Sequence, residues 1–347
     1  METKKIRLAI NGFGRIGRVL FRQVCGDPRF DIVAINDLSD VENLAYLLKY
    51  DTVYGNYKKN IKVITEGTQS YLEVDGDKFL VLKEADPKNL PWKDLKVDVV
   101  AEATGIFDSF AKARAHINAG AKKIVITSPV KEDDMEDAKT VLMGVNEAAL
   151  KTCVISSNGS CTTNASHPAA IILSEKLGVE KALLTTTHAY TATQNLVDGI
   201  SHSKTDMRRG RAAAMNMVPA SSGAAISVGK VVKALEGKFD ALAIRVPVVT
   251  VSLADLTFVT SKNTTVAEVN QLFKDAAKEE RFKGVFDVTE DQVVSSDMIG
   301  MNAGCVIDLS LTRVVGGNLV KVLAWYDNEW GYVSTLVNHI TKTASHL

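Results

Sequence analysis

A short apolar strand that runs directly into a glycine-rich turn and then a helix constrains the fold of this chain more than any other stretch. The strand is 6–10, the turn is Gly12-Phe13-Gly14-Arg15-Ile16-Gly17, and the helical stretch is 18–24. Glycines at these spacings allow a tight turn and let the backbone approach a pyrophosphate at the helix N-terminus. The glycine pattern alone is common, but its place between a strand and a helix favours a dinucleotide-binding unit over an ordinary turn in an α/β protein. Gly12, Gly14 and Gly17 are therefore candidate cofactor contacts.

An acidic residue follows the second predicted strand, 31–36. Asp37 comes twenty residues after Gly17, where a carboxylate accepts hydrogen bonds from the 2′-hydroxyl of an adenosine ribose. The same carboxylate repels a 2′-phosphate, and no arginine follows it in residues 38–40. The sequence therefore predicts NAD rather than NADP as the cofactor.

The rest of the first half continues the alternation of strands and helices. Apolar strands at 97–101 and 123–126 flank a helical stretch at 110–119, which predicts a doubly wound parallel sheet of Rossmann type. Ligands of such sheets gather at the carboxyl ends of the strands, so Thr104, Gly105 and Thr127 are either cofactor contacts or simple turn residues. The pattern of residues 71–81 predicts a β-hairpin with an Asp-Gly turn, which we expect to be an antiparallel insertion with a structural role.

A single thiol lies within Ser160-Cys161-Thr162-Thr163-Asn164, just ahead of a helical stretch at 165–177. Near a helix start, unpaired N–H groups and the helix dipole favour a thiolate. Twenty-seven residues downstream of Cys161, a β-branched strand at 183–187 ends at His188, a candidate acid/base partner. A buried structural cysteine and a hydrogen-bonded core histidine are the alternatives. A thiol nucleophile that follows a nucleotide-binding domain is coherent with aldehyde oxidation through a covalent intermediate.

The second half changes to long β-rich stretches, at 182–187, 239–260, 305–313 and 319–326. With few helices between them, these stretches predict an α+β domain whose mixed or antiparallel sheet is covered by helices on one face. A helix is expected at 220–235, and another, at 332–345, should dock onto a core.

The segment 189–214 is long and lacks clear periodicity, and it holds Arg208, Arg209 and Arg211. A connection of that length is usually functional or disordered. Its arginines form either a phosphate-binding cluster or a solvated face, and the sequence leaves both open.

Charge and cysteine content narrow the class of protein. Lys+Arg and Asp+Glu both total 41, so the chain has no global electrostatic footprint for nucleic acid or an anionic membrane. Its four cysteines show neither CxxC pairs nor metal-ligand spacing, which predicts no metal site and a reducing compartment. The first five residues lead into a strand instead of a signal-peptide core, and no uncharged run reaches membrane-spanning length. We therefore expect a cytoplasmic protein.

Several longer strings resemble those of the phosphorylating glyceraldehyde-3-phosphate dehydrogenases, and the resemblance covers nearly the whole chain. The strings are Ile10-Asn11-Gly12-Phe13-Gly14-Arg15-Ile16-Gly17-Arg18, Ser160-Cys161-Thr162-Thr163-Asn164, Thr187-His188-Ala189-Tyr190-Thr191-Ala192-Thr193-Gln194, Arg245-Val246-Pro247 and Trp325-Tyr326-Asp327-Asn328-Glu329-Trp330-Gly331-Tyr332. The resemblance implies a homotetrameric cytosolic enzyme of glycolysis that oxidises glyceraldehyde 3-phosphate with NAD and inorganic phosphate to 1,3-bisphosphoglycerate. It also implies an NAD-binding domain at 1–160, completed by the C-terminal segment 328–347, and a catalytic domain at 161–327.

The same resemblance implies a role for each site residue. Cys161 would attack the aldehyde to give a thiohemiacetal and then a thioester, while His188 would hold the thiol as a thiolate–imidazolium pair and serve as base during hydride transfer. The substrate phosphate would contact Thr191, Thr193 and Arg245. The attacking phosphate would contact Ser160, Thr162, Arg209, Ser222 and Gly223, with Arg245 near both. The cofactor contacts would be Gly12, Gly14, Arg15, Ile16, Gly17, Asp37, Thr104, Gly105, Thr127 and, at the nicotinamide carboxamide, Asn328.

The chain departs from the family pattern at a few positions near these sites. Ser222 keeps the hydroxyl of the usual threonine, whereas Ile226 replaces a common lysine and removes a positive charge near the phosphate region. Residues 165–167 carry no second cysteine, so no local disulfide can form at Cys161. The segment 189–208 is slightly longer than usual, near 202–205, which leaves the choice between Arg208 and Arg209 open.

Two other functions remain open from the sequence. An erythrose-4-phosphate dehydrogenase would share the nucleotide motif and the cysteine, although the hydroxyls of Thr191 and Thr193 favour the triose substrate. A non-catalytic binding or adhesion role on the same fold is the second. Intact Cys161, His188 and Arg245 argue against a loss of catalysis.

Overall fold

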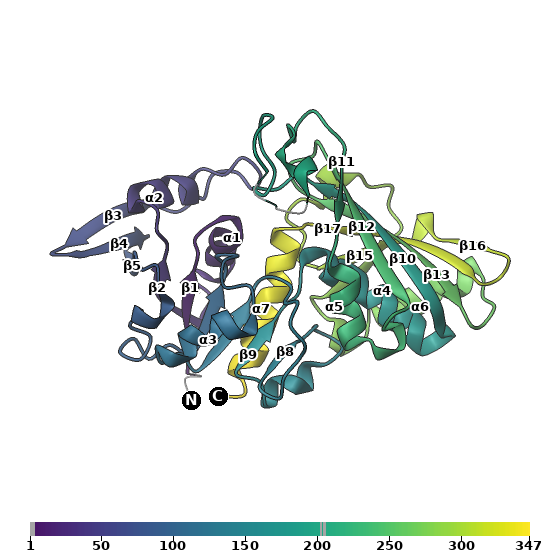
Figure 1. The fold of residues 1–347 in the computed structure, drawn as a ribbon, viewed down its shortest axis with the longest axis horizontal. Helices are drawn as coiled ribbons and strands as arrows, with labels where there is room; N and C mark the ends of the chain where they lie inside the picture. Colours follow the sequence, from purple (N-terminus) through teal and green to yellow (C-terminus); the bar gives the residue numbers. More distant parts are fainter. Residues whose placement is uncertain (1–3, 202, 204–205) are drawn as a thin grey trace. The chain divides into compact units, whose positions relative to one another are not determined.

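The computed structural model describes residues 4–201, 203 and 206–347, so His202, Lys204 and Thr205 of the lengthened segment lie outside the described residues. The chain forms two compact units (Figure 1). The first consists of the residues up to Val141 together with Glu147–Asn158 and Leu336–Leu347, and the second of Leu142–Asn146 and Gly159–Thr335. Residues 142–146 therefore pack with the second unit. Of the segment 328–347, only residues 336–347 belong to the first.

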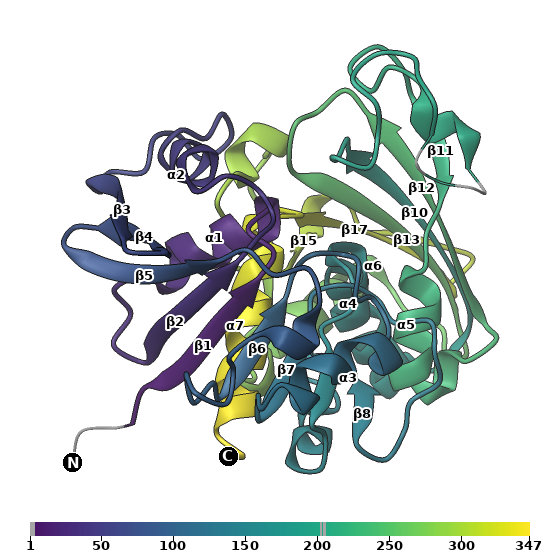
Figure 2. The same ribbon diagram turned by 60° about the vertical axis from the view of Figure 1, so that its left-hand side comes forward.

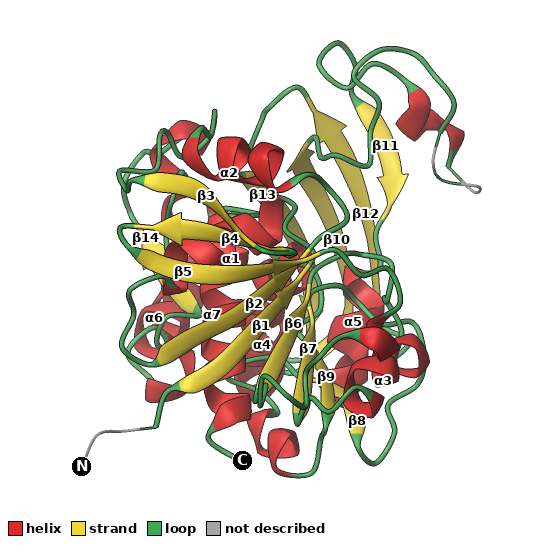
Figure 3. Cartoon of the chain, turned by 90° about the vertical axis from the view of Figure 1, so that its left-hand side faces the viewer, coloured by secondary structure: helices red, strands yellow, loops and turns green. Residues whose placement is uncertain are grey.

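The first unit is built on a predominantly parallel sheet. Among the described residues its nine strands run in the order β3-β4-β5-β2-β1-β6-β7-β9-β8 (Figure 3). The pairs from β5 to β8 are parallel, and β3 and β4 extend the sheet as antiparallel strands. The strands are β1 (Ile6–Asn11), β2 (Phe30–Asn36), β3 (Ile61–Glu66), β4 (Gln69–Val74), β5 (Asp77–Leu82), β6 (Val99–Glu102), β7 (Lys123–Ile126), β8 (Ala138–Thr140) and β9 (Ile155–Ser157).

Helices cover both faces of this sheet, and the register shows which helix covers which face. Because consecutive strand residues point to opposite faces, Ala9, Val100, Ile124 and Ile155 share one face, where they pack in one core with Phe110 of α3 (Phe110–Asn118). The next residue of each strand points to the opposite face. The expected Rossmann-type sheet is confirmed.

On that opposite face lie Ile10 of β1 and Ser156 of β9. A Cβ at Gly17 in α1 (Arg15–Val24) would be 3.3 Å from Ile10 Cγ2, so α1 packs closely here. In α7 (Trp330–Ala344), His339 places Nε2 at 2.8 Å from Ser156 Oγ. The remaining helix of the unit is α2 (Val41–Lys49), whose N-terminus is capped by the side chain of Asp40.

The predicted hairpin forms, but its second strand is more than an insertion. Strands β4 and β5 meet at Asp75-Gly76, where φ is 53° and 98°, as a type I′ turn requires. Strand β5 also pairs in parallel with β2, and the sequence pattern missed β3 altogether. The chain leaving β5 therefore emerges beside the carboxyl end of β2, next to Asp37, whose N–H donates to Leu82 O over 3.1 Å.

The second unit contains a mixed sheet with helices packed on one face (Figure 2). Its strands run in the order β11-β12-β10-β13-β17-β15-β14, with β16 paired to β17. The pairs β10–β12 and β14–β15 are parallel and the others antiparallel, as expected for an α+β domain. The strands are β10 (Val179–Ala189), β11 (Val218–Ser221), β12 (Phe239–Val246), β13 (Ser252–Thr260), β14 (Phe286–Thr289), β15 (Cys305–Asp308), β16 (Arg313–Val315) and β17 (Leu319–Tyr326).

Three helices of the second unit share a core with this sheet: α4 (Cys161–Leu177), α5 (Ala224–Val231) and α6 (Val266–Ala276). The helix expected at 220–235 is wrong at its start, because residues 218–221 pair with β12 as β11. Short 3₁₀ helices occupy Pro87–Asn89, Glu147–Lys151, Met207–Gly210 (η3), Lys233–Leu235, Glu280–Phe282, Ser295–Met298 and Leu309–Leu311. In the part of the chain that the structure describes, no helix has the length and apolar character needed to cross a bilayer.

His339 should make the protein sensitive to mild acid. Its ring is buried between Ser156 and Asn158, and desolvation lowers its pKa to about 3. A folded pKa below the unfolded value means that the stabilisation is complete above about pH 6.5 and declines as the pH falls toward the folded pKa. The free energy of unfolding should fall between about pH 7.5 and 5.5, and we expect this fall to be smaller by about 1.4 kcal/mol in His339→Asn. Urea denaturation at each pH measures it.

The exposed His346 provides the control, because His346→Asn removes a histidine that keeps most of its hydration. An acid slope that stays the same in His339→Asn and in the unaltered protein would contradict the neutral buried ring.

Candidate active site

Cys161 is the first residue of α4, as the sequence predicts. Ser160 caps the helix: its Oγ accepts a hydrogen bond from Thr163 N over 3.0 Å, and Ser160 N donates to Thr163 Oγ1 over 3.2 Å. This reciprocal box satisfies two backbone groups at the helix start. It also means that the Ser160 hydroxyl is already engaged. The cap fixes the backbone that carries the thiol.

His188 reaches the same point from β10. Along this strand Ala182, Leu184 and His188 are buried while Leu183 is 65% exposed, so the even-numbered residues face the helices. As a result, His188 Nε2 lies 3.4 Å from Cys161 Sγ. The structure therefore brings together the two residues that the sequence could only pair as a hypothesis.

The electrostatics of this pair differ from the expected ion pair. Although Cys161 keeps some exposure, desolvation by the surrounding protein raises the pKa of its thiol, and the nearby Arg245 charge opposes this only in part. Desolvation also lowers the pKa of His188 to about 3, helped by the charges of Arg245 and Arg209. Burial of the two side chains therefore favours their neutral forms. Burial thus opposes the expected thiolate–imidazolium pair, because it penalises both charges.

Arg245 is held beside the histidine by strand pairing. His188 and Arg245 are register partners of the parallel strands β10 and β12. Arg245 Nη1 lies 2.8 Å from His188 Nδ1 and donates to Ala189 O over 3.1 Å. Its Nε is buried and makes no hydrogen bond in the structure. An unsatisfied guanidinium N–H next to a candidate nucleophile is a natural anion contact.

Two threonine hydroxyls follow His188 along the chain, and η3 brings a second guanidinium to them. Thr191 Oγ1 and Thr193 Oγ1 are 2.9 Å apart, and Arg209 Nη1 donates to Thr193 Oγ1 over 3.0 Å. Both Arg208 and Arg209 pair with Asp206, over 3.0 and 3.5 Å, but the Arg208 side chain is 61% exposed and that of Arg209 only 16%. The geometry thus joins Arg209, and not Arg208, to the threonine pair.

Other predicted phosphate contacts lie at helix starts or are already engaged. Ser222 and Gly223 precede α5, with Ser222 Oγ accepting from Ala224 N over 3.3 Å and no atom within 4 Å of a Cβ built on Gly223. Thr162 Oγ1 lies 3.0 Å from Tyr326 OH. Ile226, in the first turn of α5, is 64% exposed and adds no charge there.

Tyr326 is a neighbour of the pair that the sequence reasoning missed. Its hydroxyl lies 2.6 Å from Thr186 Oγ1 and also contacts Thr162, and its ring meets that of His188 edge-on at 5.9 Å between centroids. Within the string around Tyr326, only Asn328 was predicted to be a site residue. In the structure, Asn328 Oδ1 accepts from Ser252 Oγ over 3.0 Å. Alternation along β17 was the one available signal, because it places Tyr326 on the buried face.

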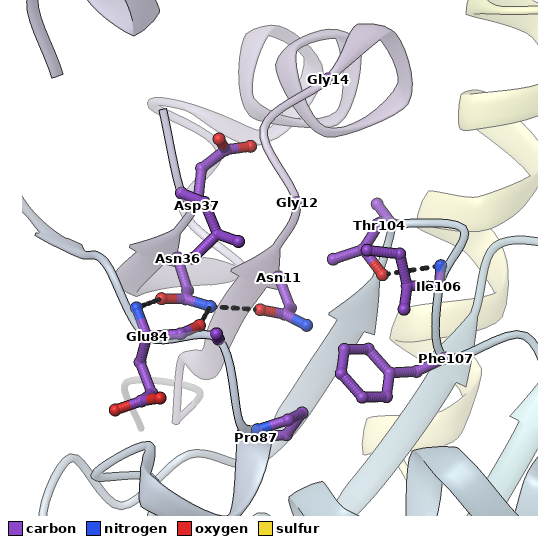
Figure 4. A pocket seen from close by; sticks show the side chains of 13 residues that line it. Asn11, Gly12, Gly14, Asn36, Asp37, Glu84, Pro87, Thr104, Ile106 and Phe107 are labelled. Atoms are coloured by element: carbon purple, nitrogen blue, oxygen red, sulfur yellow. Dashed lines mark hydrogen bonds between the residues drawn. The ribbon is translucent and has the colours of Figure 1, made fainter. Parts of the chain in front are cut away.

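A separate cavity of about 260 Å³ lies in the first unit, at the carboxyl ends of its strands (Figure 4). Of the predicted cofactor residues, Gly12, Gly14, Asp37 and Thr104 line it. The remaining lining residues are Asn11, Asn36, Leu38, Glu84, Ala85, Pro87, Ala103, Ile106 and Phe107. Arg15, Ile16, Gly17, Gly105 and Thr127 are not among them. Arg15 instead forms an ion pair of 2.6 Å with Asp51, and Thr127 Oγ1 donates to Glu102 O.

The glycines of the turn fit a bound dinucleotide. A Cβ at Gly12, where φ is +94°, would lie 2.6 Å from Thr104 N, and one at Gly17 would lie 2.0 Å from Gly12 O. Only glycine permits this close approach of turn, helix and strand. Gly14 has no atom within 4 Å of a built Cβ, so the space in front of its backbone is open for a pyrophosphate.

Asp37 is poised to receive ribose hydroxyls. Burial acts to raise the pKa of its carboxyl, but hydrogen bonds from Ser39 N and Phe13 N outweigh it and hold the pKa below its usual range. Beneath it, Asn36 Nδ2 donates to Asn11 Oδ1 and to Glu84 O, which ties three strand ends together (Figure 4). No cluster of His, Cys, Asp and Glu suited to a metal ion occurs among the residues that the structure describes.

Comparison with known proteins matches this chain over nearly its full length. Residues 6–110 match the family model described as glyceraldehyde 3-phosphate dehydrogenase, NAD binding domain, and residues 160–328 match the C-terminal domain of the same name. A glyceraldehyde-3-phosphate dehydrogenase of Clostridium pasteurianum is 46% identical over 335 residues, covering 95% of this chain and 96% of the relative. Glyceraldehyde-3-phosphate dehydrogenase 2 of Bacillus subtilis is 44% identical, and the match covers 99% of this chain and 98% of the relative. The chloroplastic glyceraldehyde-3-phosphate dehydrogenase A of Chlamydomonas reinhardtii is 44% identical, and the match covers 98% of this chain and 89% of the relative.

Proposed function

Because the chain belongs to the glyceraldehyde-3-phosphate dehydrogenase family, we propose that it oxidises glyceraldehyde 3-phosphate with NAD and inorganic phosphate to 1,3-bisphosphoglycerate, a step of glycolysis. The observation that carries this proposal is the 3.4 Å contact between Cys161 Sγ and His188 Nε2, at a helix start and beside an arginine–threonine cluster. A thiol, a base and anion contacts are the groups that phosphorylating aldehyde oxidation needs.

The two residues divide the chemistry between them. Cys161 Sγ bonds to the aldehyde carbon while His188 Nε2 takes the thiol proton and passes it to the carbonyl oxygen, which gives a thiohemiacetal and leaves Nε2 free again. His188 then accepts the hydroxyl proton as the carbon–oxygen double bond of a thioester forms. NAD, when bound, accepts the hydride that leaves the carbon. A phosphate oxygen then attacks the thioester and the carbon–sulfur bond breaks. His188 returns its proton to Sγ, so the acyl phosphate leaves with the thiol and the neutral base restored.

Two anion sites serve this sequence of steps. We assign the substrate phosphate to Thr191, Thr193 and Arg245, and the attacking phosphate to Thr162, Ser222 and Gly223 with Ser160 at their edge. The contact between Arg209 and Thr193 supports a position for Arg209 beside both anions. Hydroxyls and guanidinium groups are suited to phosphate because they donate hydrogen bonds to its oxygens.

Residues 1–160, with the C-terminal segment, are proposed to bind NAD, and residues 161–327 to carry the chemistry. We expect Asp37→Ser to raise KM for NAD about 10- to 100-fold, because a charge-assisted hydrogen bond contributes about 1.5–3 kcal/mol. The preference for NAD over NADP should shrink accordingly, measured as the ratio of kcat/KM values. The exposed Asp94 gives a matched control, since Asp94→Ser leaves the cavity untouched. Equal use of both cofactors by the unaltered protein would contradict the role of Asp37.

A homotetramer in the cytoplasm is the proposed working form. The segment between β10 and β11 supports an assembly, because it exposes apolar side chains that a subunit contact would cover: Leu196 is 80% exposed, Ile200 92% and Met215 82%. Sedimentation velocity of the purified protein measures the oligomeric state directly.

The activity is tested by NADH absorbance with glyceraldehyde 3-phosphate, NAD and phosphate present together. We expect NADH to form with all three and to stop when phosphate is withheld, after one acylation of the thiol. A higher kcat/KM on erythrose 4-phosphate would transfer the proposal to the tetrose substrate. Folded protein that forms no NADH from either aldehyde would overturn it.

A further inference from the structure

His188 Nδ1 faces two groups that it cannot satisfy together. It lies 2.7 Å from Ala189 O and 2.8 Å from Arg245 Nη1. The carbonyl oxygen needs a hydrogen on Nδ1, whereas the guanidinium N–H needs a lone pair there, and one ring nitrogen carries only one of the two. In the free protein the hydrogen bond from Arg245 to Nδ1 is favoured, because it is charge-assisted and Arg245 also donates to Ala189 O. The ring hydrogen then sits on Nε2, toward the sulfur.

This arrangement opposes the form of His188 that catalysis uses. To take the proton of Cys161, Nε2 must carry a lone pair, so the hydrogen of the neutral ring must be on Nδ1. After the transfer both nitrogens carry hydrogens, and Nδ1 again has to donate to Ala189 O. The contact with Arg245 Nη1 is therefore unfavourable in both working states of the base.

Arg245 has reason to move when an anion arrives. No carboxylate within the described part of the chain forms an ion pair with it, and its buried Nε has no hydrogen-bond partner. The titratable and charged groups facing His188 are Cys161 from α4, Arg245 from β12, Arg209 from η3 and Tyr326 from β17. This set includes two cations and no carboxylate, so the charge that can draw Arg245 away must come from a ligand.

We propose that a phosphate monoester acts as a switch on the base, drawing the Arg245 guanidinium off His188 Nδ1 so that the ring donates to Ala189 O and turns a lone pair on Nε2 toward Cys161. The inference rests on the proposed function and deepens it. The ring loses one hydrogen from Nε2 to solvent and gains one at Nδ1, so its charge does not change. Arg245 is thereby a positioning residue for His188 as well as a phosphate contact, and the substrate phosphate raises kcat as well as affinity.

The tautomer itself can be observed without turnover. In protein with ¹⁵N-labelled histidine rings, the His188 signals are assigned by their loss in His188→Gln. We expect a lone pair on Nδ1 and a hydrogen on Nε2 in the free protein, and the reverse when glycerol 3-phosphate, which has no aldehyde, is added to saturation. In Arg245→Leu the reversed pattern should be present from the start. Glycerol 3-phosphate that binds, by calorimetry, and leaves the His188 pattern unchanged would overturn the switch.

Kinetics on an aldehyde without a phosphate give a second, independent readout. Glyceraldehyde cannot draw Arg245 away, so Arg245→Leu should raise its kcat on the order of tenfold while lowering kcat/KM for glyceraldehyde 3-phosphate. A residue that only binds phosphate would leave the glyceraldehyde rate unchanged, and that result would contradict the proposal. Arg211→Leu is the matched control, because Arg211 is exposed and paired with Asp198. The ring signals do not depend on activity, so failure of the switch is distinguishable from failure of the proposed function.

Discussion

Replacing Cys161 with serine is expected to lower kcat/KM for glyceraldehyde 3-phosphate by about 10⁴-fold or more, because the variant lacks the thiol that lies against the base. A serine hydroxyl is a far weaker nucleophile than a thiol at neutral pH, and the ester it would form conserves less of the oxidation energy than a thioester. The measurement is the initial rate of NADH formation under saturating NAD and phosphate. The pre-steady-state burst of NADH should also be lost, since no acyl-enzyme accumulates.

Cys25→Ser is the matched control for this substitution. Cys25 is also a free, partly exposed cysteine, but it lies at the end of α1 in the first unit, outside the proposed machinery. It should retain the rate and, like Cys161→Ser, the thermal unfolding midpoint of the unaltered protein. A Cys161→Ser variant with a rate within tenfold of the original would remove the thiol from the mechanism.

Replacing His188 with asparagine is expected to lower kcat by about 10²- to 10⁴-fold, the range for loss of a general base. Without Nε2 at 3.4 Å, the thiol must lose its proton to water. Since burial raises the pKa of the Cys161 thiol, the thiolate fraction of the variant is small at neutral pH and grows as the pH rises. Its kcat/KM should therefore climb steeply with pH, whereas the unaltered protein should show a flatter profile.

Inactivation by iodoacetamide at several pH values measures the same thiolate without substrate. His346→Asn, at the exposed C-terminal end, should leave both profiles in place. If His188→Asn kept the rate and the pH profile of the unaltered protein, another group would have to accept the proton.

The sequence predicted the parts of the molecule that depend on neighbours along the chain. The glycine turn, the start of α4 at Cys161 and the carboxylate at the end of β2 all follow from local rules for turns, caps and strand ends. The cysteine–histidine pair needed one further step, because alternation along β10 turns His188 toward the helices.

What the sequence could not predict depends on contacts between distant segments. Glu84 and Pro87 line the cavity because β5 pairs in parallel with β2. A hairpin pattern in the sequence predicts the pairing of β5 with β4 but not this second pairing. Residues 220 and 221 read as the start of a helix in the sequence, but residues 218–221 form a strand because they pair with the distant β12. The burial that raises the pKa of the Cys161 thiol was also missed, because a helix start favours a thiolate and no local pattern reports the desolvation that opposes it.

The division of the first unit into three stretches of chain has a consequence for biosynthesis. Its last stretch, Leu336–Leu347, includes the fully buried Leu336 and Ile340 and the His339 that meets Ser156. The ribosome makes this stretch only after the second unit, so the part of the sheet face that carries Ser156 stays without its α7 contacts while the second unit is made. Domains are generally completed in the order of translation. Here the first unit is finished only after the second unit has been made, and we expect the nascent chain to need protection of that part of the face until residues 336–347 have been added.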